Sequence, residues 1–197
     1  MLEVVKNDSE KSAGLSAPQV GESLQIAICR RMDLEEELKI TNYRLQIKKE
    51  KLGLIKDKRE KISRAEKIKK LELEVKKMKA KLKDSIWEVV INPEFTFESE
   101  VFSEYWEGCL SVNNGNIFGK VSRPEAVEID YYNIEGNKKH LRAENYFSHV
   151  IQHELDYLDG ITFLDHLSKT RRDMLLKKMQ KQIKLHPPHV HGAHCHH

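Results

Sequence analysis

The amino-acid sequence predicts an α+β domain that carries an inserted antiparallel helical hairpin and ends in a further helix. Three observations support this prediction. Apolar residues repeat at heptad spacing within residues 34–84, apolar and polar residues alternate between residues 86 and 132, and a helical pattern follows from Asn145 to Asp159. Strands with a central and a terminal helix are typical of the α+β class. We divide the chain into a domain of residues 1–33 and 85–185, a charged coiled-coil hairpin at 34–84 and a His-rich disordered tail at 186–197.

The inserted segment is recognised by its charge and its heptads. Residues 35–84 contain 18 Lys or Arg and 10 Asp or Glu, a net charge of +8, whereas the rest of the chain has a net charge of −5. Two apolar stripes run through it, made of Ile68, Leu71, Val75, Met78 and Leu82, and of Leu38, Leu45 and Leu52. Such stripes predict two helices packed against each other, with a reversal near Gly53 or Asp57-Lys58. Two interpretations of the charge stay open: it only keeps the hairpin solvated, or the basic arm contacts RNA or another acidic surface.

The remaining elements follow from short patterns along the chain. Apolar runs predict strands at Gln25–Cys29 and Ile86–Ile91, the second followed by a turn at Asn92-Pro93. Looser alternation marks Phe95, Phe97, Val101 and Tyr105, and stricter alternation marks Val127, Ile129 and Tyr131, before a hairpin turn at Glu135-Gly136-Asn137. The helix Asn145–Asp159 is closed by Gly160, and an amphipathic basic helix is expected at Lys169–Leu185.

Composition narrows the range of functions. No stretch approaches the roughly 18–20 consecutive apolar residues that cross a bilayer, so we expect no membrane partner. The cysteines are Cys29, Cys109 and Cys195. An odd and sparse set argues against a disulfide framework and favours a reducing compartment.

Three motifs carry residues suited to hydrolysis at a metal. They are Gly14-Leu15-Ser16-Ala17-Pro18-Gln19, Glu107-Gly108-Cys109-Leu110-Ser111 and Gln152-His153-Glu154-Leu155-Asp156-Tyr157-Leu158-Asp159-Gly160. The last is similar to the H-E-x-x-H helix of metallohydrolases. There, two histidines one turn apart hold a metal and the glutamate handles the protons of water. Here tyrosine stands at the second histidine position.

In this order the motifs resemble those of the peptide deformylase family, and Gly119-Lys120-Val121-Ser122-Arg123-Pro124 resembles the family's G-x-V-x-R-P. The resemblance covers residues 12–34 and about 86–180 and skips the hairpin. It implies a peptide-deformylase-like fold, with mixed or antiparallel sheets around a central metal-site helix. It also implies a metal-dependent hydrolase of protein biosynthesis, acting in N-terminal methionine processing. The substrates would be N-formylmethionyl nascent peptides, from whose methionine the formyl group is removed.

The resemblance assigns roles by position. Cys109 and His153 would bind a divalent metal, Fe2+ first and Zn2+, Ni2+ or Co2+ as alternatives, with Tyr157 at the position of the missing histidine. Glu154 would act as general base and then general acid. Gln19 and the backbone N–H of Leu110 would stabilise the oxyanion. We expect a cytoplasmic protein, or one in a bacterial-type organelle, where formylated substrates occur.

Tyr157 is the main departure from the family pattern, and three interpretations stay open. Its phenolate binds the metal; or His149, one turn before His153, replaces the missing ligand; or metal binding is weak. In the third case the protein would be a catalytically weak or inactive module that binds peptide N-termini or the ribosome.

Further features have two interpretations each. Eleven residues precede Ser12, fewer than in family members, so the chain is either truncated or compensated by other elements. Ser12 stands where the first motif glycine is expected, and it is strained if that position needs a positive φ. The helix at residues 169–185 either covers the sheet or docks on the ribosome, as a C-terminal helix does in bacterial family members. The His-rich tail either binds metal or has no catalytic part.

Overall fold

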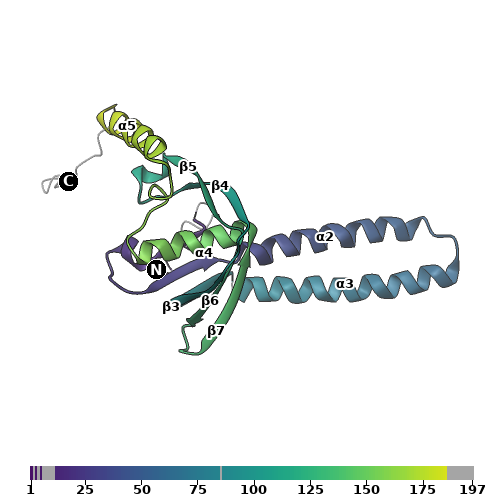
Figure 1. Ribbon diagram of the computed structural model, residues 1–197. Coiled ribbons are helices and arrows are strands. Elements are labelled where there is room, and N and C mark those ends of the chain that lie inside the picture. The colour runs from purple at the N-terminus through teal and green to yellow at the C-terminus, as the bar shows by residue number, and fades with distance from the viewer. Residues whose placement is uncertain (2, 4, 6–11, 85, 186–197) are drawn as a thin grey trace, which may run out of the picture.

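The computed structural model describes residues 1, 3, 5, 12–84 and 86–185. Two antiparallel sheets lie around a central helix, and a long helical hairpin projects from one end (Figure 1). The larger sheet has the order β1-β2-β3-β6-β7, with β1 Gly14–Ser16, β2 Ile26–Arg30, β3 Trp87–Glu98, β6 Ala126–Tyr132 and β7 Lys138–Glu144. The smaller sheet pairs β4 Phe102–Gly108 with β5 Phe118–Pro124. The α+β prediction is confirmed.

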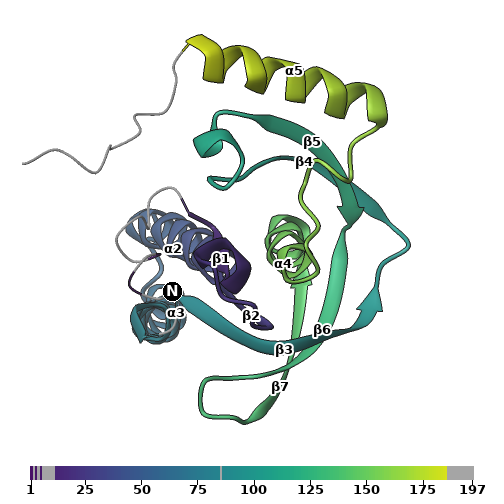
Figure 2. The same cartoon turned by 90° about the vertical axis from the view of Figure 1, so that its left-hand side faces the viewer.

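The central helix α4, Asn145–Leu158, forms the core with the larger sheet, as the end-on view in Figure 2 shows. Its apolar residues recur at helical spacing, and Val150, Ile151 and Leu155 pack against Val127 and Ile129 of β6. The predicted helix is confirmed. Its end is made by Gly160, which adopts a φ of +74°, while the next amide, of Ile161, donates to the Asp156 carbonyl at 2.9 Å.

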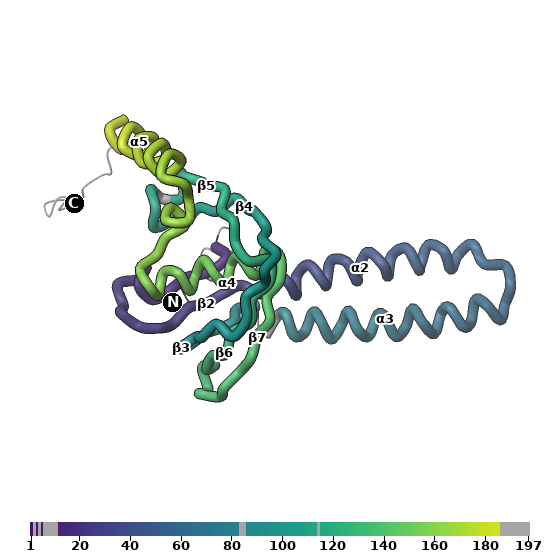
Figure 3. The backbone as a smooth tube through the Cα atoms, in the orientation of Figure 1, coloured from purple at the N-terminus to yellow at the C-terminus, as the bar shows by residue number. Residues whose placement is uncertain are grey.

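The inserted hairpin consists of α2, Met32–Gly53, and α3, Lys58–Asp84, and we call these residues the arm (Figure 3). Its apolar stripes face inward, since Ile68 and Val75 are 7% and 6% exposed. Lys49 of α2 also pairs with Glu72 of α3 at 2.6 Å. The predicted helical hairpin is confirmed, and it begins two residues before the predicted boundary at residue 34.

The predicted turn at Asn92-Pro93 is wrong, because β3 continues through both residues. The pairing of β3 with β6 shifts its register between Ile91 and Glu94. A local irregularity accommodates Pro93, which has no N–H to donate. Asn92 adopts a φ of +47° there, a conformation that asparagine tolerates better than most residues. The chain does reverse between β3 and β4, so the pattern at Phe95, Phe97, Val101 and Tyr105 spans two strands.

The smaller sheet covers a second apolar cluster, made of Cys109, Ile117, Val121, Tyr157, Phe163 and Leu167. Helix α5, Lys169–Leu185, packs against it through Leu175 and Met179, and the predicted bounds of this helix are confirmed. The hairpin turn predicted at residues 135–137 joins β6 to β7.

Two further sequence predictions concern the C-terminal tail and membrane spans. The His-rich tail at 186–197 lies outside the described residues. Within the described part of the chain, no helix has the length and apolar character needed to cross a membrane.

Candidate metal and catalytic site

An open pocket of about 780 Å³ lies where α4 meets β1, the 3-10 turn η1 (Ala17–Val20) and the loop after β4. Five of the six residues predicted for the site line it: Gln19, Cys109, Leu110, His153 and Glu154. Three segments far apart in the sequence therefore meet as the motifs predicted. Tyr157 is not among the lining residues and is packed behind them in the second apolar cluster.

Cys109 and His153 form the centre of the site. Burial raises the pKa of the Cys109 thiol, but the neighbouring His153, Tyr157 and Ser111 side chains outweigh it and leave the pKa lowered. Burial lowers the pKa of His153, yet bonds to Cys109 and Glu107 outweigh this and raise it to about 10. The two side chains are therefore two metal donors held in contact, each favouring the charged form of the other.

Glu107, the residue two before Cys109, binds three side chains at once. Its carboxylate contacts Nδ1 of His153 at 2.9 Å and Nδ1 of His149 at 3.0 Å. It also accepts two hydrogen bonds from Arg123, at 2.7 and 3.0 Å. Burial raises the pKa of Glu107, but these partners outweigh it and hold the pKa far below its usual range. Because Nδ1 of His153 is committed to Glu107, Nε2 is the nitrogen left to bind a metal.

His149 does not replace the missing ligand. It is 1% exposed, and both ring nitrogens have partners, Nδ1 with Glu107 at 3.0 Å and Nε2 with Ser103 Oγ at 3.1 Å. Within the described part of the chain, the contacts of His149 hold the Glu107 carboxylate in place. The interpretation of a Cys109–His149–His153 metal site is therefore wrong.

Tyr157 is 8% exposed, and its hydroxyl has no hydrogen-bond partner of good geometry within the described residues. Burial and the neighbouring Cys109 sulfur raise the pKa of Tyr157 well above its usual value. The side chain is therefore a neutral phenol in the protein alone. Its ring lies 5.4 Å from the His153 ring, between centroids, and fills the apolar cluster.

Glu154 is 4% exposed and points towards β1. The Ser16 hydroxyl lies 2.7 Å from Glu154 Oε2 and 2.6 Å from its backbone carbonyl oxygen. Burial raises the pKa of Glu154, against opposing effects of the His153 charge and of Ser16. A buried carboxyl with a raised pKa suits proton transfer near neutral pH. Gly14 allows this approach, because a Cβ there would lie 2.5 Å from the Glu154 side chain.

Gln19 is oriented by its own turn. Its Oε1 accepts a hydrogen bond from the Ser16 backbone N–H at 2.7 Å, which directs Nε2 into the pocket. Nε2 donates to Cys109 Sγ at 3.0 Å and to Ser111 Oγ at 3.1 Å. Leu110 lies beside it in the loop after β4.

Sequence reasoning assigned no role to Glu107, Arg123 or Ser16. All three residues lie inside the motifs named above. The opposite charges of Glu107 and Arg123, 16 residues apart, were the signal that could have indicated their ion pair. Ser12 is not strained, because the non-glycine residues with positive φ in the described part of the chain are Asn92, Asn113 and Asn145. Its hydroxyl donates to the Gly14 carbonyl at 2.8 Å.

Two of the three expected donors for a divalent metal, Cys109 and His153, lie together. Among the described residues, no group of three or more His, Cys, Asp and Glu is placed to hold a metal ion, since the third position is tyrosine. Yet a thiolate and an imidazole oriented by a carboxylate suit a transition metal. A buried hydroxyl without a partner calls for an explanation, and a bound ion beside Cys109 would supply one. Cys109 and His153 are thus the two strong donors, and Tyr157 stands in the sequence at the position of the third.

The chain is similar to known proteins both in sequence and in structure. The family model described as polypeptide deformylase matches residues 1–173. A peptide deformylase-like protein of Rickettsia conorii is 50% identical over 109 residues, which cover 55% of this chain and 58% of the relative. A peptide deformylase of Bartonella tribocorum is 40% identical over 96 residues, covering 49% and 53%. The chain therefore spans little more than half the length of these relatives.

Solved structures show the same fold. The peptide deformylase of Thermus thermophilus matches with a TM-score of 0.59 at 25% identity, covering 94% of this chain and 78% of that one. The peptide deformylase of Ehrlichia chaffeensis matches with a TM-score of 0.60 at 22% identity, covering 94% and 80%.

Proposed function

The chain belongs to the peptide deformylase family, and from this premise we propose that it removes the N-formyl group from the N-terminal methionine of newly made polypeptides. The observation that carries the proposal is the meeting of Gln19, Cys109, His153 and Glu154 in one pocket. The products would be formate and a peptide with a free amino group. N-formylmethionyl nascent peptides would be its substrates and the ribosome a partner, in the cytoplasm or a bacterial-type organelle.

Cys109 and His153 would hold a divalent metal, with Fe2+ our first choice. Tyr157 would occupy the position of the third protein ligand. When bound, such an ion would polarise the formyl carbonyl and bring the pKa of a coordinated water towards ~7. Glu107 keeps His153 oriented for this role through the 2.9 Å contact with Nδ1.

The protein's own residues would carry the proton and the developing charge. Glu154 would take a proton from the attacking water and then deliver it to the departing amine nitrogen, so that the C–N bond breaks as the amine is protonated. Gln19 Nε2 and the backbone N–H of Leu110 would donate to the oxyanion, and each such donor contributes about 3 kcal/mol. The partly exposed apolar side chains of Leu110 and Phe118 at the pocket suit a methionine side chain.

The test is formate release from a formyl-Met peptide by the full chain, supplied anaerobically with Fe2+, Ni2+ or Co2+. We expect release that a chelator abolishes. Glu154→Gln should lose release and keep its metal content, whereas Glu144→Gln, an exposed glutamate on β7, should leave both unchanged. No release with any of these ions would overturn the proposal. The comparisons give no support to the alternative of a weak or inactive binding module.

A further inference from the structure

Helix α2 carries a second apolar stripe, on the side that faces away from α3. We call Ile40, Tyr43, Ile47 and Leu54 the outer stripe. These residues follow heptad steps, with Glu50 at the one remaining heptad position. Tyr43 precedes Leu45, of the stripe that packs against α3, by two residues, which is about 200° around the helix. The outer stripe therefore lies opposite the side that holds the hairpin together.

The outer stripe is open to solvent along an arm that projects from the domain (Figure 1). Ile40, Tyr43 and Leu54 are 45%, 65% and 81% exposed, and Ile47 is partly buried. A helix that is apolar on two opposite sides at heptad spacing fits between two neighbouring helices. Helix α3 is one neighbour, so the outer stripe has the form of a contact for another helix.

The charges of α2 are separated along its length. Residues 32–37 contain four acidic and no basic side chains, whereas residues 48–53 contain three lysines and one glutamate. The helix dipole favours this distribution, but it does not explain the exposed apolar side chains between the two ends. A second α2 in antiparallel orientation would bring each acidic end against a basic end, whereas a parallel copy would bring like charges together.

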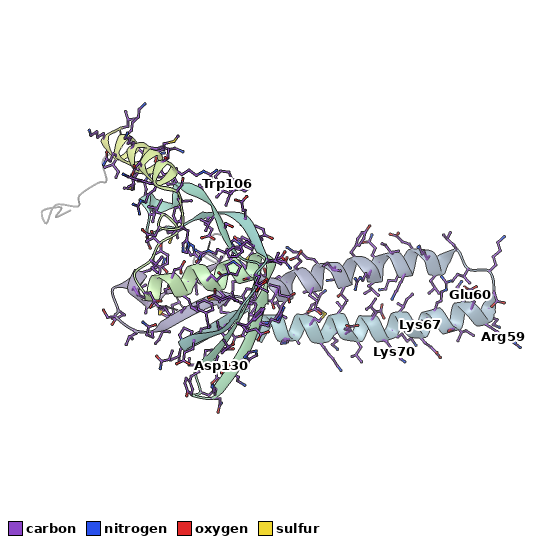
Figure 4. All side chains as sticks on the ribbon, in the orientation of Figure 1. Arg59, Glu60, Lys67, Lys70, Trp106 and Asp130 are labelled. Atoms are coloured by element: carbon purple, nitrogen blue, oxygen red, sulfur yellow. The ribbon has the colours of Figure 1, made fainter. Side chains whose placement is uncertain are left out.

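The base and the tip of the arm are complementary in the same way. A hollow of about 930 Å³ lies at the base, lined mainly by α2, β7 and the start of α4. Six of its lining residues are Asp or Glu and three are Lys or Arg. The tip, residues 51–61, has five Lys or Arg and two Asp or Glu, and Arg59 is labelled there in Figure 4. Because two copies have arms of equal length, antiparallel packing brings each basic tip to the acidic base of the other arm.

We propose that two copies of this chain associate through the outer stripe of α2, with their arms antiparallel. A contact between two identical subunits about a two-fold axis requires a surface that is complementary to itself. The outer stripe and the separated charges of α2 meet that requirement on a single helix. The domains, each with its pocket, then lie at opposite ends of the paired arms.

The test is sedimentation equilibrium of the full chain over a concentration range of about 1 to 100 μM. A chelator is present so that metal ions bound by the histidines of the tail do not link chains. We expect a reversible dimer with a dissociation constant inside this range, as for other contacts of modest size. Ile40→Gln together with Tyr43→Gln should raise the dissociation constant at least about tenfold, because apolar burial is lost at the centre of the contact. Glutamine has a higher helix propensity than isoleucine or tyrosine, so the arm stays helical.

A matched control removes two apolar side chains from the other helix of the arm. Ile62 and Leu73 of α3 are 56% and 54% exposed. Ile62→Gln together with Leu73→Gln should change the dissociation constant less than about threefold, since neither residue belongs to the outer stripe. Equal losses in the two variants would overturn the proposal, and so would a chain that stays monomeric over the whole concentration range.

A charge exchange tests the orientation of the two arms. Glu37 and Lys51 are exposed and lie 14 residues, or two heptads, apart on one side of α2. In the antiparallel dimer Glu37 of each copy lies near Lys51 of the other, so Glu37→Lys should weaken association at least about threefold. Adding Lys51→Glu restores opposite charges at both places and should restore the affinity. A double variant as weak as Glu37→Lys would overturn the antiparallel arrangement.

Far-UV circular dichroism establishes that the variants fold. Formate release, measured on the same samples, should be equal in the arm variants and the unchanged chain, because the substituted residues lie outside the pocket. Failure of association and failure of the proposed activity therefore appear in separate assays.

Discussion

At the scale of single residues, Glu107 determines the geometry of the site more than any of the proposed catalytic residues does. It is one negative charge shared by Arg123, His149 and His153, and its side chain is 6% exposed. A carboxylate so placed is stable only while its partners remain, because an unpaired buried charge costs several kcal/mol. The same contacts orient the imidazole of His153, so stability and ligand geometry depend on one side chain.

We predict that Arg123→Leu destabilises the protein by about 3–5 kcal/mol, since it leaves the buried charge of Glu107 without the partner that donates two hydrogen bonds to it. Denaturant unfolding measures the change. Arg142→Leu is the control, because Arg142 also pairs with two glutamates but is 49% exposed. Exposed pairs contribute about 1 kcal/mol or less. Equal effects of the two changes would mean that the buried ion pair has no special weight.

Tyr157 is the residue where metal affinity is decided. We predict that Tyr157→His raises the affinity for Co2+ or Ni2+ by at least about tenfold, because even residues that only support a ligand change affinity 10–100-fold. Equilibrium dialysis of protein without the tail measures it, and formate release should rise in parallel.

Tyr157→Phe separates two roles of the tyrosine. It keeps the ring that packs in the second apolar cluster and removes only the unpartnered hydroxyl. If the hydroxyl is a weak ligand, affinity falls in this variant, whereas unchanged affinity shows that the ring alone matters. A Tyr157→His protein with unaltered metal content would show that the missing histidine does not limit the site.

At the scale of elements, the position of α4 against β1 determines where Glu154 lies. The two elements approach so closely that position 14 has no room for a side chain. We predict that Gly14→Ala lowers formate release at least tenfold, because a Cβ at 2.5 Å displaces the Glu154 carboxyl and small misplacements cost up to about 100-fold.

Gly53→Ala is the matched control for this substitution. Gly53 ends α2, nothing lies within 4 Å of its added Cβ, and its φ is not in the left-handed range. Formate release should therefore stay the same, and helix propensity favours alanine. A Gly14→Ala enzyme with full activity would show that the Glu154 carboxyl can be displaced without loss of formate release.

Elements also show what sequence patterns reveal and what they miss. The heptads of the arm and the apolar face of α4 depend on contacts close in sequence, so they were predicted correctly. Asn92-Pro93 was misread because a proline in a strand is tolerated only through a register shift with a partner, β6, that lies far away in sequence. The roles of Glu107 and Arg123 depend likewise on the pairing of β4 with β5, which no local pattern reveals.

At the scale of the whole molecule, the arm joins two neighbouring strands of the larger sheet. Arg30 at the end of β2 pairs directly with Trp87 at the start of β3. The Arg31 amide donates to the Ile86 carbonyl at 2.8 Å, just beyond that pair. The two chain ends that hold the arm are therefore already in hairpin register, and the arm occupies the place of a tight turn.

We predict that replacing residues 32–85 with Asn-Gly leaves a folded domain with unchanged formate release. Asn-Gly favours the turn that matches the twist of an antiparallel pair, and Arg31, which pairs with Glu88 at 3.1 Å, is retained. Circular dichroism, thermal unfolding and formate release measure the outcome. A chain that no longer folds would show that α2 and α3 are part of the core. A folded chain that keeps its activity would show that catalysis depends on α4 and the strands and not on the arm.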